Sequence, residues 1–268
     1  MLPAGPRKSG IPYPAAMDLG IRGRRAAVAA ATDGLGLGTA RALVADGVHV
    51  AICGRNPERL AAAVASLEAI GGGDVHGLVA DVGTTAGAEA FVAEATDALG
   101  GLDILVPNAG GPPPGGFSST NLAAYGPALE LSLLSTVAMC MAAVPAMRAQ
   151  GWGRVAAITS VSVRQPIPGL ILSNTARAGV TGFLKTLALE VAADGVTVNS
   201  VQPGSHATER LRSMHSGDLT AAAAAVPTGA LGRPEDFGAV VAFLCSDHAR
   251  FITGAALPVD GGSYRALQ

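Results

Sequence analysis

The chain has 268 residues, of which 49% are hydrophobic and only 14% charged, and its formal net charge is -2. This length and apolar content suit one α/β domain with a large core, and no basic run marks nucleic acid as a partner. No apolar stretch reaches the roughly 18 uninterrupted residues of a membrane span, so we expect no membrane insertion.

The first residues differ in composition from the rest. Residues 1–16 contain four prolines and no apolar core, which argues against a signal peptide and predicts a disordered arm over residues 1–18. Cys53, Cys140 and Cys245 lie in apolar contexts, so we expect buried thiols in a reducing compartment. We therefore predict a cytoplasmic protein with one domain, residues 19–268, and we assign no metal site.

From Arg24 onward, strand and helix patterns alternate almost without interruption. Short apolar runs predict seven strands, at residues 26–31, 48–53, 75–80, 102–106, 154–159, 196–201 and 256–259. Runs with helical spacing predict helices at residues 36–46, 57–70, 85–99, 122–150, 170–193 and 234–246. This alternation is typical of a parallel sheet with helices on both faces, whose ligands bind at the carboxyl ends of the strands.

A glycine-rich turn joins the first predicted strand to the first helix. Glycines here let backbone N–H groups approach a pyrophosphate, and the helix N-terminus faces its charge. The second strand ends at Gly54-Arg55, where a dinucleotide-binding fold contacts the adenine ribose. An arginine suits a 2′-phosphate, so we expect NADP(H) in preference to NAD(H). A purely structural turn and a solvated Arg55 are the alternatives.

Further motifs follow the predicted strand ends. They are Asp81-Val82, Asn108-Ala109-Gly110, Ser160, Asn199, Pro203-Gly204 with Thr208, Gly232-Arg-Pro-Glu235 and Val259-Asp-Gly-Gly262. In this order and spacing they resemble the short-chain dehydrogenase/reductase family, most closely its 3-oxoacyl-carrier-protein-reductase-like branch, over about residues 24–262. The resemblance implies a single-domain Rossmann-type doubly wound α/β fold with a seven-stranded parallel sheet, a nicotinamide cofactor and carbonyl–alcohol redox chemistry on a small molecule.

The resemblance also implies a set of cofactor-binding positions. Asp81 would contact adenine, Asn108 and its neighbours would line the adenine ribose, and Thr208 would hold the nicotinamide carboxamide. The predicted set is Thr32, Gly36, Leu37, Gly38, Arg55, Asp81, Val82, Asn108, Ala109, Gly110, Arg177, Pro203, Gly204 and Thr208.

The cofactor turn departs from the family pattern Thr-Gly-x-x-x-Gly-x-Gly. Its first two positions hold Ala31 and Thr32, and a β-branched Thr32 disfavours positive φ, so we expect the turn to take another path. Asp33 puts a carboxylate near the expected pyrophosphate, which is unfavourable unless it caps a helix or pairs with a cation. Leu35 stands where many NADP-using members carry a second basic residue, so phosphate recognition would rest mainly on Arg55.

The catalytic pattern departs further. The family uses an asparagine, a serine, and a tyrosine followed four residues later by a lysine. Ser160 keeps the serine, whereas Ser132, Ser173 and Arg177 occupy the other three positions. An aliphatic hydroxyl is shorter and much less acidic than a phenol, and an arginine does not release its proton in proteins. The set therefore predicts a non-standard proton donor.

Other residues offer partial substitutes for the missing groups. His206 titrates near neutral pH and is a candidate general acid, although a loop histidine is more often merely exposed. Arg177 keeps a positive charge and five donors, which suit a nicotinamide ribose or a substrate carboxylate. In the alternative interpretation, Ser173 bonds to its own helix and Arg177 lies on a solvated or subunit face.

Two functions from different classes are compatible with these residues. One is an NADP(H)-linked oxidoreductase, which the retained Arg55, Ser160 and Thr208 favour. The other is a non-redox protein that uses the old pocket for ligand binding, as a scaffold or for other chemistry. The helices at residues 122–150 and 170–193 are apolar beyond what one sheet face needs, which predicts a homo-oligomer, in particular a homo-tetramer.

Overall fold

The computed structural model describes residues 17–214 and 216–267, which form a doubly wound α/β domain. Its sheet has seven strands in the order β3-β2-β1-β4-β5-β6-β7, and every neighbouring pair is parallel, as the sequence predicts. The strands are β1 (Arg25–Val28), β2 (His49–Gly54), β3 (Val75–Val79), β4 (Ile104–Val106), β5 (Gly153–Ile158), β6 (Val196–Pro203) and β7 (Ala256–Val259).

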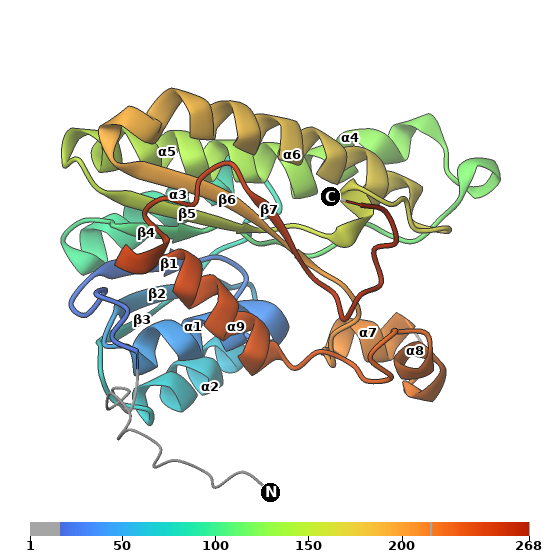
Figure 1. Cartoon of the computed structure of the whole chain (residues 1–268), viewed down its shortest axis with the longest axis horizontal. Helices are drawn as coiled ribbons and strands as arrows, with labels where there is room; N and C mark the ends of the chain where they lie inside the picture. Colours follow the sequence, from blue (N-terminus) through green and yellow to red (C-terminus); the bar gives the residue numbers. More distant parts are fainter. Residues whose placement is uncertain (1–16, 215, 268) are drawn as a thin grey trace, which may run out of the picture.

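Helices cover both faces of the sheet (Figure 1). One face carries α1 (Gly34–Ala45), α2 (Pro57–Glu68) and α9 (Pro234–Leu244), and the other carries α3 (Thr85–Leu99), α5 (Ser135–Ala149) and α6 (Ile171–Val191). Each layer encloses a core of fully buried side chains, with Phe237 in the first layer and Phe91 in the second. Short helical segments are η1 (Phe117–Ser119), η4 (Val161–Val163), η5 (Ala192–Asp194) and η6 (Asp247–Ala249).

The long helix predicted at residues 122–150 is present over Leu122–Ala149, but it is not α-helical throughout. The structure has a 3-10 turn η2 (Leu122–Ala124), then α4 (Tyr125–Leu129), a π-helical turn η3 (Glu130–Leu134) and finally α5. Hydrophobic spacing does not reveal a single wide turn, because the apolar pattern resumes after it. By length and composition, Leu122–Ala149 could span a membrane, but half of its most apolar window is buried inside this fold.

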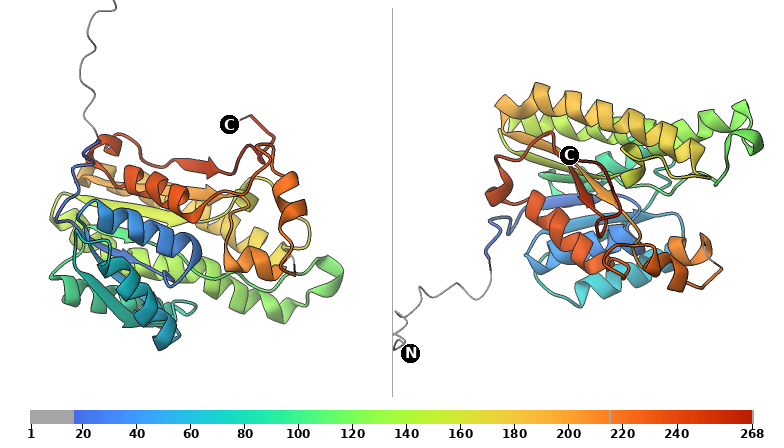
Figure 2. Two further views of the ribbon diagram at one scale, coloured as in Figure 1. Left: turned by 90° about the horizontal axis from the view of Figure 1, so that it is seen from below. Right: turned by 45° about the vertical axis from the view of Figure 1, so that its right-hand side comes forward.

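The segment that follows β6 contains two further helices, α7 (Glu209–Met214) and α8 (Thr220–Ala224). In Figures 1 and 2 they project beyond the carboxyl ends of the strands.

The predicted amino-terminal arm and the cysteines are the remaining features of the chain. Residues 1–16 of the arm lie outside the described residues, whereas the backbone oxygen of Asp18 accepts a 2.8 Å hydrogen bond from His248 Nε2. The three cysteines are buried, and burial raises the pKa of each thiol to about 12.

Candidate active site

Most of the predicted site residues lie where four adjacent strands end. β1, β4, β5 and β6 are neighbours in the sheet. Their carboxyl ends lead into the turn before α1, the Asn108 segment, the Ser160 segment and the Thr208 segment. Because the strands are parallel, these four segments meet at one edge, where ligands of such folds bind.

The turn between β1 and α1 is shaped by Ala30 and Gly34. These residues carry the left-handed backbone conformation, with φ of 47° and 56°, and Thr32 does not. Thr32 instead packs its methyl group against the end of β2, where a Cβ on Gly54 would collide with it. The strand accordingly ends at Val28, three residues earlier than the sequence predicts.

The two glycines kept from the family pattern allow α1 to pack closely. A Cβ on Gly36 would meet the backbone oxygen of Ala30 at 2.6 Å, and one on Gly38 would collide with the backbone of Pro234 in α9. Leu37, between them, packs partly buried on the core. These positions hold the helix N-terminus against the turn that would face a pyrophosphate.

Asp33 occupies the N-cap position of α1 and is also paired with a cation. Its Oδ1 accepts a 2.7 Å hydrogen bond from the backbone N–H of Gly34, and its Oδ2 lies 3.4 Å from Arg59 Nη2. Both conditions that make a carboxylate tolerable here are therefore met. Arg59 is a basic residue that the sequence analysis missed, because only the fold brings the first turn of α2 beside this turn. Arg55, at the end of β2, is exposed.

Asn108 connects two of the strand ends. Its amide nitrogen donates hydrogen bonds of 3.2 Å to the backbone oxygens of both Ala29 and Ala30. The side chain thereby fixes the turn after β1 against the segment after β4, whose next residues, Ala109 and Gly110, are increasingly exposed.

Asp81 and Val82 follow the end of β3. Asp81 is exposed, and its Oδ1 accepts a 3.0 Å hydrogen bond from the backbone N–H of Gly83, while Val82 is buried. The Asp81 carboxylate is therefore at the surface.

Ser160 begins the short helix η4 after β5. Its backbone is extended, with φ of -166°, and its Oγ accepts a 3.1 Å hydrogen bond from the backbone N–H of Ser162. This contact occupies one lone pair of the oxygen and leaves the O–H proton available to another acceptor.

Helix α6 presents Ser173 and Arg177 one turn apart. Ser173 is 9% exposed, and its hydroxyl makes no hydrogen bond to any other part of residues 17–214 or 216–267. Arg177 Nη1 donates a 3.3 Å hydrogen bond to the backbone oxygen of Ile158, the last residue of β5. Burial, together with repulsion from Arg210, lowers the pKa of the Arg177 guanidinium to about 10. Arg177 is therefore directed into the sheet edge rather than onto a solvated face.

Ser132 lies inside the π-helical turn η3. It is 3% exposed, and its Oγ has no hydrogen-bond partner within the described part of the chain. Buried hydroxyls without a partner are rare, and π-helical turns are frequent at functional sites. Contacts of η3 with α6 place the serine beside the helix that carries Ser173.

The loop after β6 brings Thr208 to the glycine turn. Pro203 ends the strand, and the N–H of Gly204 donates a 3.0 Å hydrogen bond to Val259 of the neighbouring strand. Thr208 Cγ2 would lie 3.3 Å from a Cβ on Gly34. Its Oγ1 accepts a hydrogen bond of 3.2 Å from the N–H of Leu211, in the first turn of α7.

The contacts of His206 favour a packing role over the general-acid role considered from the sequence. The residue is 5% exposed, and its ring meets Phe237 edge-on, with 5.2 Å between centroids. A Cβ on Gly232 would approach the ring to 2.5 Å, and His206 Nδ1 lies 3.2 Å from the Gly204 oxygen. Burial lowers the pKa of His206 and so disfavours protonation of its ring.

Arg210 is a second site residue that the sequence analysis missed. It extends from α7 to the segment after β4, with Nη1 3.3 Å from the Gly111 oxygen and Nη2 3.4 Å from the Pro112 oxygen. The absence of a side chain at Gly111 makes room for this guanidinium. No motif marks Arg210, because its partners are backbone oxygens almost 100 residues away in sequence.

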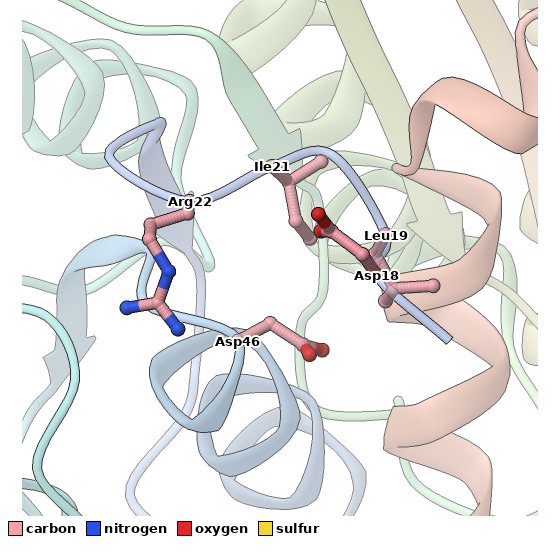
Figure 3. Close-up of a pocket in the computed structure, with 5 residues that line it drawn as sticks. All are labelled: Asp18, Leu19, Ile21, Arg22 and Asp46. Carbon is pink, nitrogen blue, oxygen red and sulfur yellow. The ribbon is translucent and has the colours of Figure 1, made fainter. Parts of the chain in front are cut away.

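A cavity of about 230 Å³ lies at the opposite, amino-terminal edge of the sheet. It is lined by Asp18, Leu19, Ile21, Arg22 and Asp46 (Figure 3). Asp46 follows α1, and Arg22 precedes β1, so this cavity is separate from the carboxyl edge described above.

The fold and the edge motifs define a dinucleotide-binding enzyme class, and comparisons with known proteins specify it. The family model described as enoyl-(acyl carrier protein) reductase matches residues 29–264. The human dehydrogenase/reductase SDR family member 4 is 35% identical over 241 residues, covering 89% of this chain and 86% of the relative.

Solved structures of reductases also resemble this chain. L-sorbose reductase from Gluconobacter frateurii, complexed with NADPH and L-sorbose, has a TM-score of 0.87 and 32% identity over 94% of this chain and all of its own. An NADPH-bound short-chain oxidoreductase from Pseudomonas aeruginosa PAO1, described as containing an atypical catalytic center, has a TM-score of 0.84 and 29% identity over 91% of this chain and 98% of its own. The chain belongs to the short-chain dehydrogenase/reductase family of NAD(P)-dependent oxidoreductases.

Proposed function

We propose that the protein is an NADP(H)-linked oxidoreductase that interconverts a carbonyl compound and its alcohol without a tyrosine proton donor. The observation that carries this proposal is the joint placement of Ser160 and Arg177 at the end of β5, one free to donate an O–H and the other cationic. The NADPH-bound structure from P. aeruginosa PAO1 supports the idea that an atypical centre is compatible with cofactor binding.

The residues at the cofactor edge fit a phosphorylated dinucleotide. Arg55 and Arg59 are both exposed around the end of β2, where a 2′-phosphate would lie, and guanidinium groups bind phosphate through paired N–H donors. The pairing of Asp33 with Arg59 offsets the carboxylate nearest the expected pyrophosphate. Bound NADPH would supply a hydride to the carbonyl carbon.

Ser160 polarises the carbonyl in this proposal. Because its Oγ already accepts from Ser162 N–H, its proton points to another acceptor, and a substrate carbonyl oxygen at the strand edge takes that place. A fixed donor of this kind stabilises negative charge as it develops on oxygen.

Arg177 would stabilise the same charge and also contact the nicotinamide ribose. With a pKa of about 10, the guanidinium stays charged at neutral pH. It therefore acts as a cation, while the proton that completes the alcohol comes from water, since no serine hydroxyl is acidic enough to supply it. Ser173 has only a minor role in the reaction under this proposal.

Titration of the protein with NADPH and NADH, followed by cofactor fluorescence, tests the proposal. We expect saturable binding of NADPH that is at least tenfold tighter than that of NADH, because a charge-assisted hydrogen bond contributes about 1.5–3 kcal/mol. Equal affinities for NADPH and NADH would show that Arg55 and Arg59 do not bind the 2′-phosphate. Failure to bind either dinucleotide would favour the non-redox alternative.

We also propose that the protein is a homo-tetramer. Met141 on α5 and Leu189 on α6 are 69% and 73% exposed, and Leu134 in η3 is 43% exposed. Large apolar side chains on adjacent helices suit burial against a second copy. Light scattering at micromolar concentration should give four times the chain mass, and a monomer would contradict the proposal.

A further inference from the structure

Two arginines from different elements occupy the same part of the carboxyl edge. Arg177 comes from α6 and contacts the Ile158 oxygen at the end of β5, and Arg210 comes from α7 and contacts the Gly111 and Pro112 oxygens after β4. β4 and β5 are paired neighbours in the sheet. Both guanidinium groups therefore contact segments at the ends of these neighbouring strands, and Arg210 is close enough to Arg177 to repel its charge.

In the part of the chain that the structure describes, neither guanidinium has a counter-charge. Within residues 17–214 and 216–267, no carboxylate comes within 4.0 Å of Arg177 or Arg210, although several other arginines are paired in this way. Their hydrogen bonds within the described residues use three N–H donors, all directed to backbone oxygens. Each guanidinium has five donors, so most of the pair's donors have no partner among the described residues, and the exposed Arg210 presents its own to solvent, where a ligand can reach them.

A cation that loses water without gaining a counter-ion is unfavourable, and a second nearby cation adds to that cost. The lowered pKa of Arg177 reflects both burial and the closeness of Arg210. An anionic ligand between the two groups would remove this cost and satisfy the unused donors. Guanidinium groups bind carboxylate and phosphate oxygens in paired, planar contacts.

We infer that Arg177 and Arg210 form a binding site for an anionic group of the substrate, so that the protein acts on carbonyl compounds bearing a carboxylate or a phosphate. This inference rests on the proposed function, because it places the anion beside the carbonyl that Ser160 polarises. The 2′-phosphate of the cofactor is expected at the end of β2, which lies on the other side of β1 from β4 and β5.

The test compares anionic and neutral ligands on the full chain. Aliphatic oxo acids of increasing length, their methyl esters and a phosphorylated ketone are titrated against NADPH-saturated protein, with bound-cofactor fluorescence and turnover as readouts. We expect the best oxo acid or phosphate to bind at least tenfold more tightly than its neutral counterpart. Tighter binding of the oxo acid would identify the anionic group of the substrate as a carboxylate, and tighter binding of the phosphorylated ketone would identify it as a phosphate.

Arg210→Gln should reduce that preference about tenfold, on the usual scale of a charged hydrogen bond, and Arg210→Lys should retain part of it. Arg212→Gln is the matched control, because Arg212 lies on the same helix, is exposed like Arg210 and, among the described residues, pairs with Glu209 at 3.7 Å. The control should leave the preference unchanged. Equal binding of acid and ester, or a loss in Arg210→Gln that affects NADPH rather than the oxo acid, would overturn the inference.

A second readout separates this inference from the proposed function. Oxo acid alone, without NADPH, should raise the melting temperature of the unmodified protein and of Arg212→Gln more than that of Arg210→Gln. This result would support the anion site even if no dinucleotide bound. Identical shifts in the unmodified protein and Arg210→Gln would contradict the anion site even if NADPH bound tightly.

Discussion

Arg177 donates a hydrogen bond of 3.3 Å to the backbone oxygen of Ile158, two residues before Ser160. This contact holds a cation of α6 against the strand whose end carries the serine. The centre therefore has a positively charged donor, Arg177, and a neutral donor, Ser160. Ser173 stands where the family has a tyrosine, so no phenol accompanies them. The proposed chemistry follows from that arrangement, since both groups stabilise charge on a carbonyl oxygen and neither is an efficient acid.

The first prediction separates the two serines. Ser160→Ala should reduce the turnover rate by about 10²-fold or more, because it removes a fixed donor to the developing oxyanion. Ser173→Ala should cost far less, since this hydroxyl is short and only weakly acidic. Steady-state kinetics on the best substrate from the ligand series measures both effects. A complete loss of activity in Ser173→Ala would show that the roles are assigned wrongly.

Restoration of the family residues provides a second prediction. Ser173→Tyr combined with Arg177→Lys should raise activity on simple neutral ketones, because a phenol beside a cation can deliver a proton. The same double variant should lose activity on oxo acids, since it removes one of the two guanidinium groups. If the double variant binds NADPH but reduces neither substrate type, the pocket has diverged beyond these positions.

Cofactor preference yields a third prediction. Arg55→Ala and Arg59→Ala should each weaken NADPH binding, by about 1.5–3 kcal/mol for a lost charged hydrogen bond, and Arg55→Ala should leave NADH binding almost unchanged. Arg59→Ala should also weaken NADH binding, to a smaller extent, because it frees Asp33 to repel the pyrophosphate of both cofactors. Arg212→Ala is the control. A variant that loses NADPH and NADH equally would indicate a structural role for the arginine.

The pH dependence of stability tests the packing role of His206. Burial lowers its folded-state pKa below the usual value of about 6.5, so below that pH the unfolded chain binds a proton more readily than the folded one. Stability should therefore be fully present above about pH 6.5 and should fall as the pH drops towards the folded-state pKa. His206→Gln should flatten this decline in urea unfolding curves, whereas an unchanged decline would mean that His206 is not responsible.

Much of the fold was predictable because it depends on local patterns. Apolar runs and glycine turns recur at each strand end, so the parallel sheet and the edge at which Ser160, Asn108 and Thr208 meet could be inferred. The interruption at Ser132 could not, because a π-helical turn changes one backbone hydrogen bond without altering the apolar pattern.

The site was harder to predict where its contacts join distant segments. Arg59 and Arg210 looked like ordinary surface charges, and only the fold brings one beside Asp33 and the other beside Gly111. His206 looked exposed because it follows a strand in a glycine-rich loop, yet Phe237 of α9 and the missing side chain of Gly232 create a buried place for its ring. Such packing depends on residues far apart in sequence.

The most direct test of the central claim is hydride transfer from NADPH deuterated at the nicotinamide C4 position to the carbonyl substrate. The unmodified protein should produce an alcohol that carries deuterium on the former carbonyl carbon, and Ser160→Ala should do so about 10²-fold more slowly. Tight NADPH binding with no deuterium transferred to any oxo acid, phosphorylated ketone or neutral ketone would contradict the claim and identify a protein that has kept the fold without its redox chemistry.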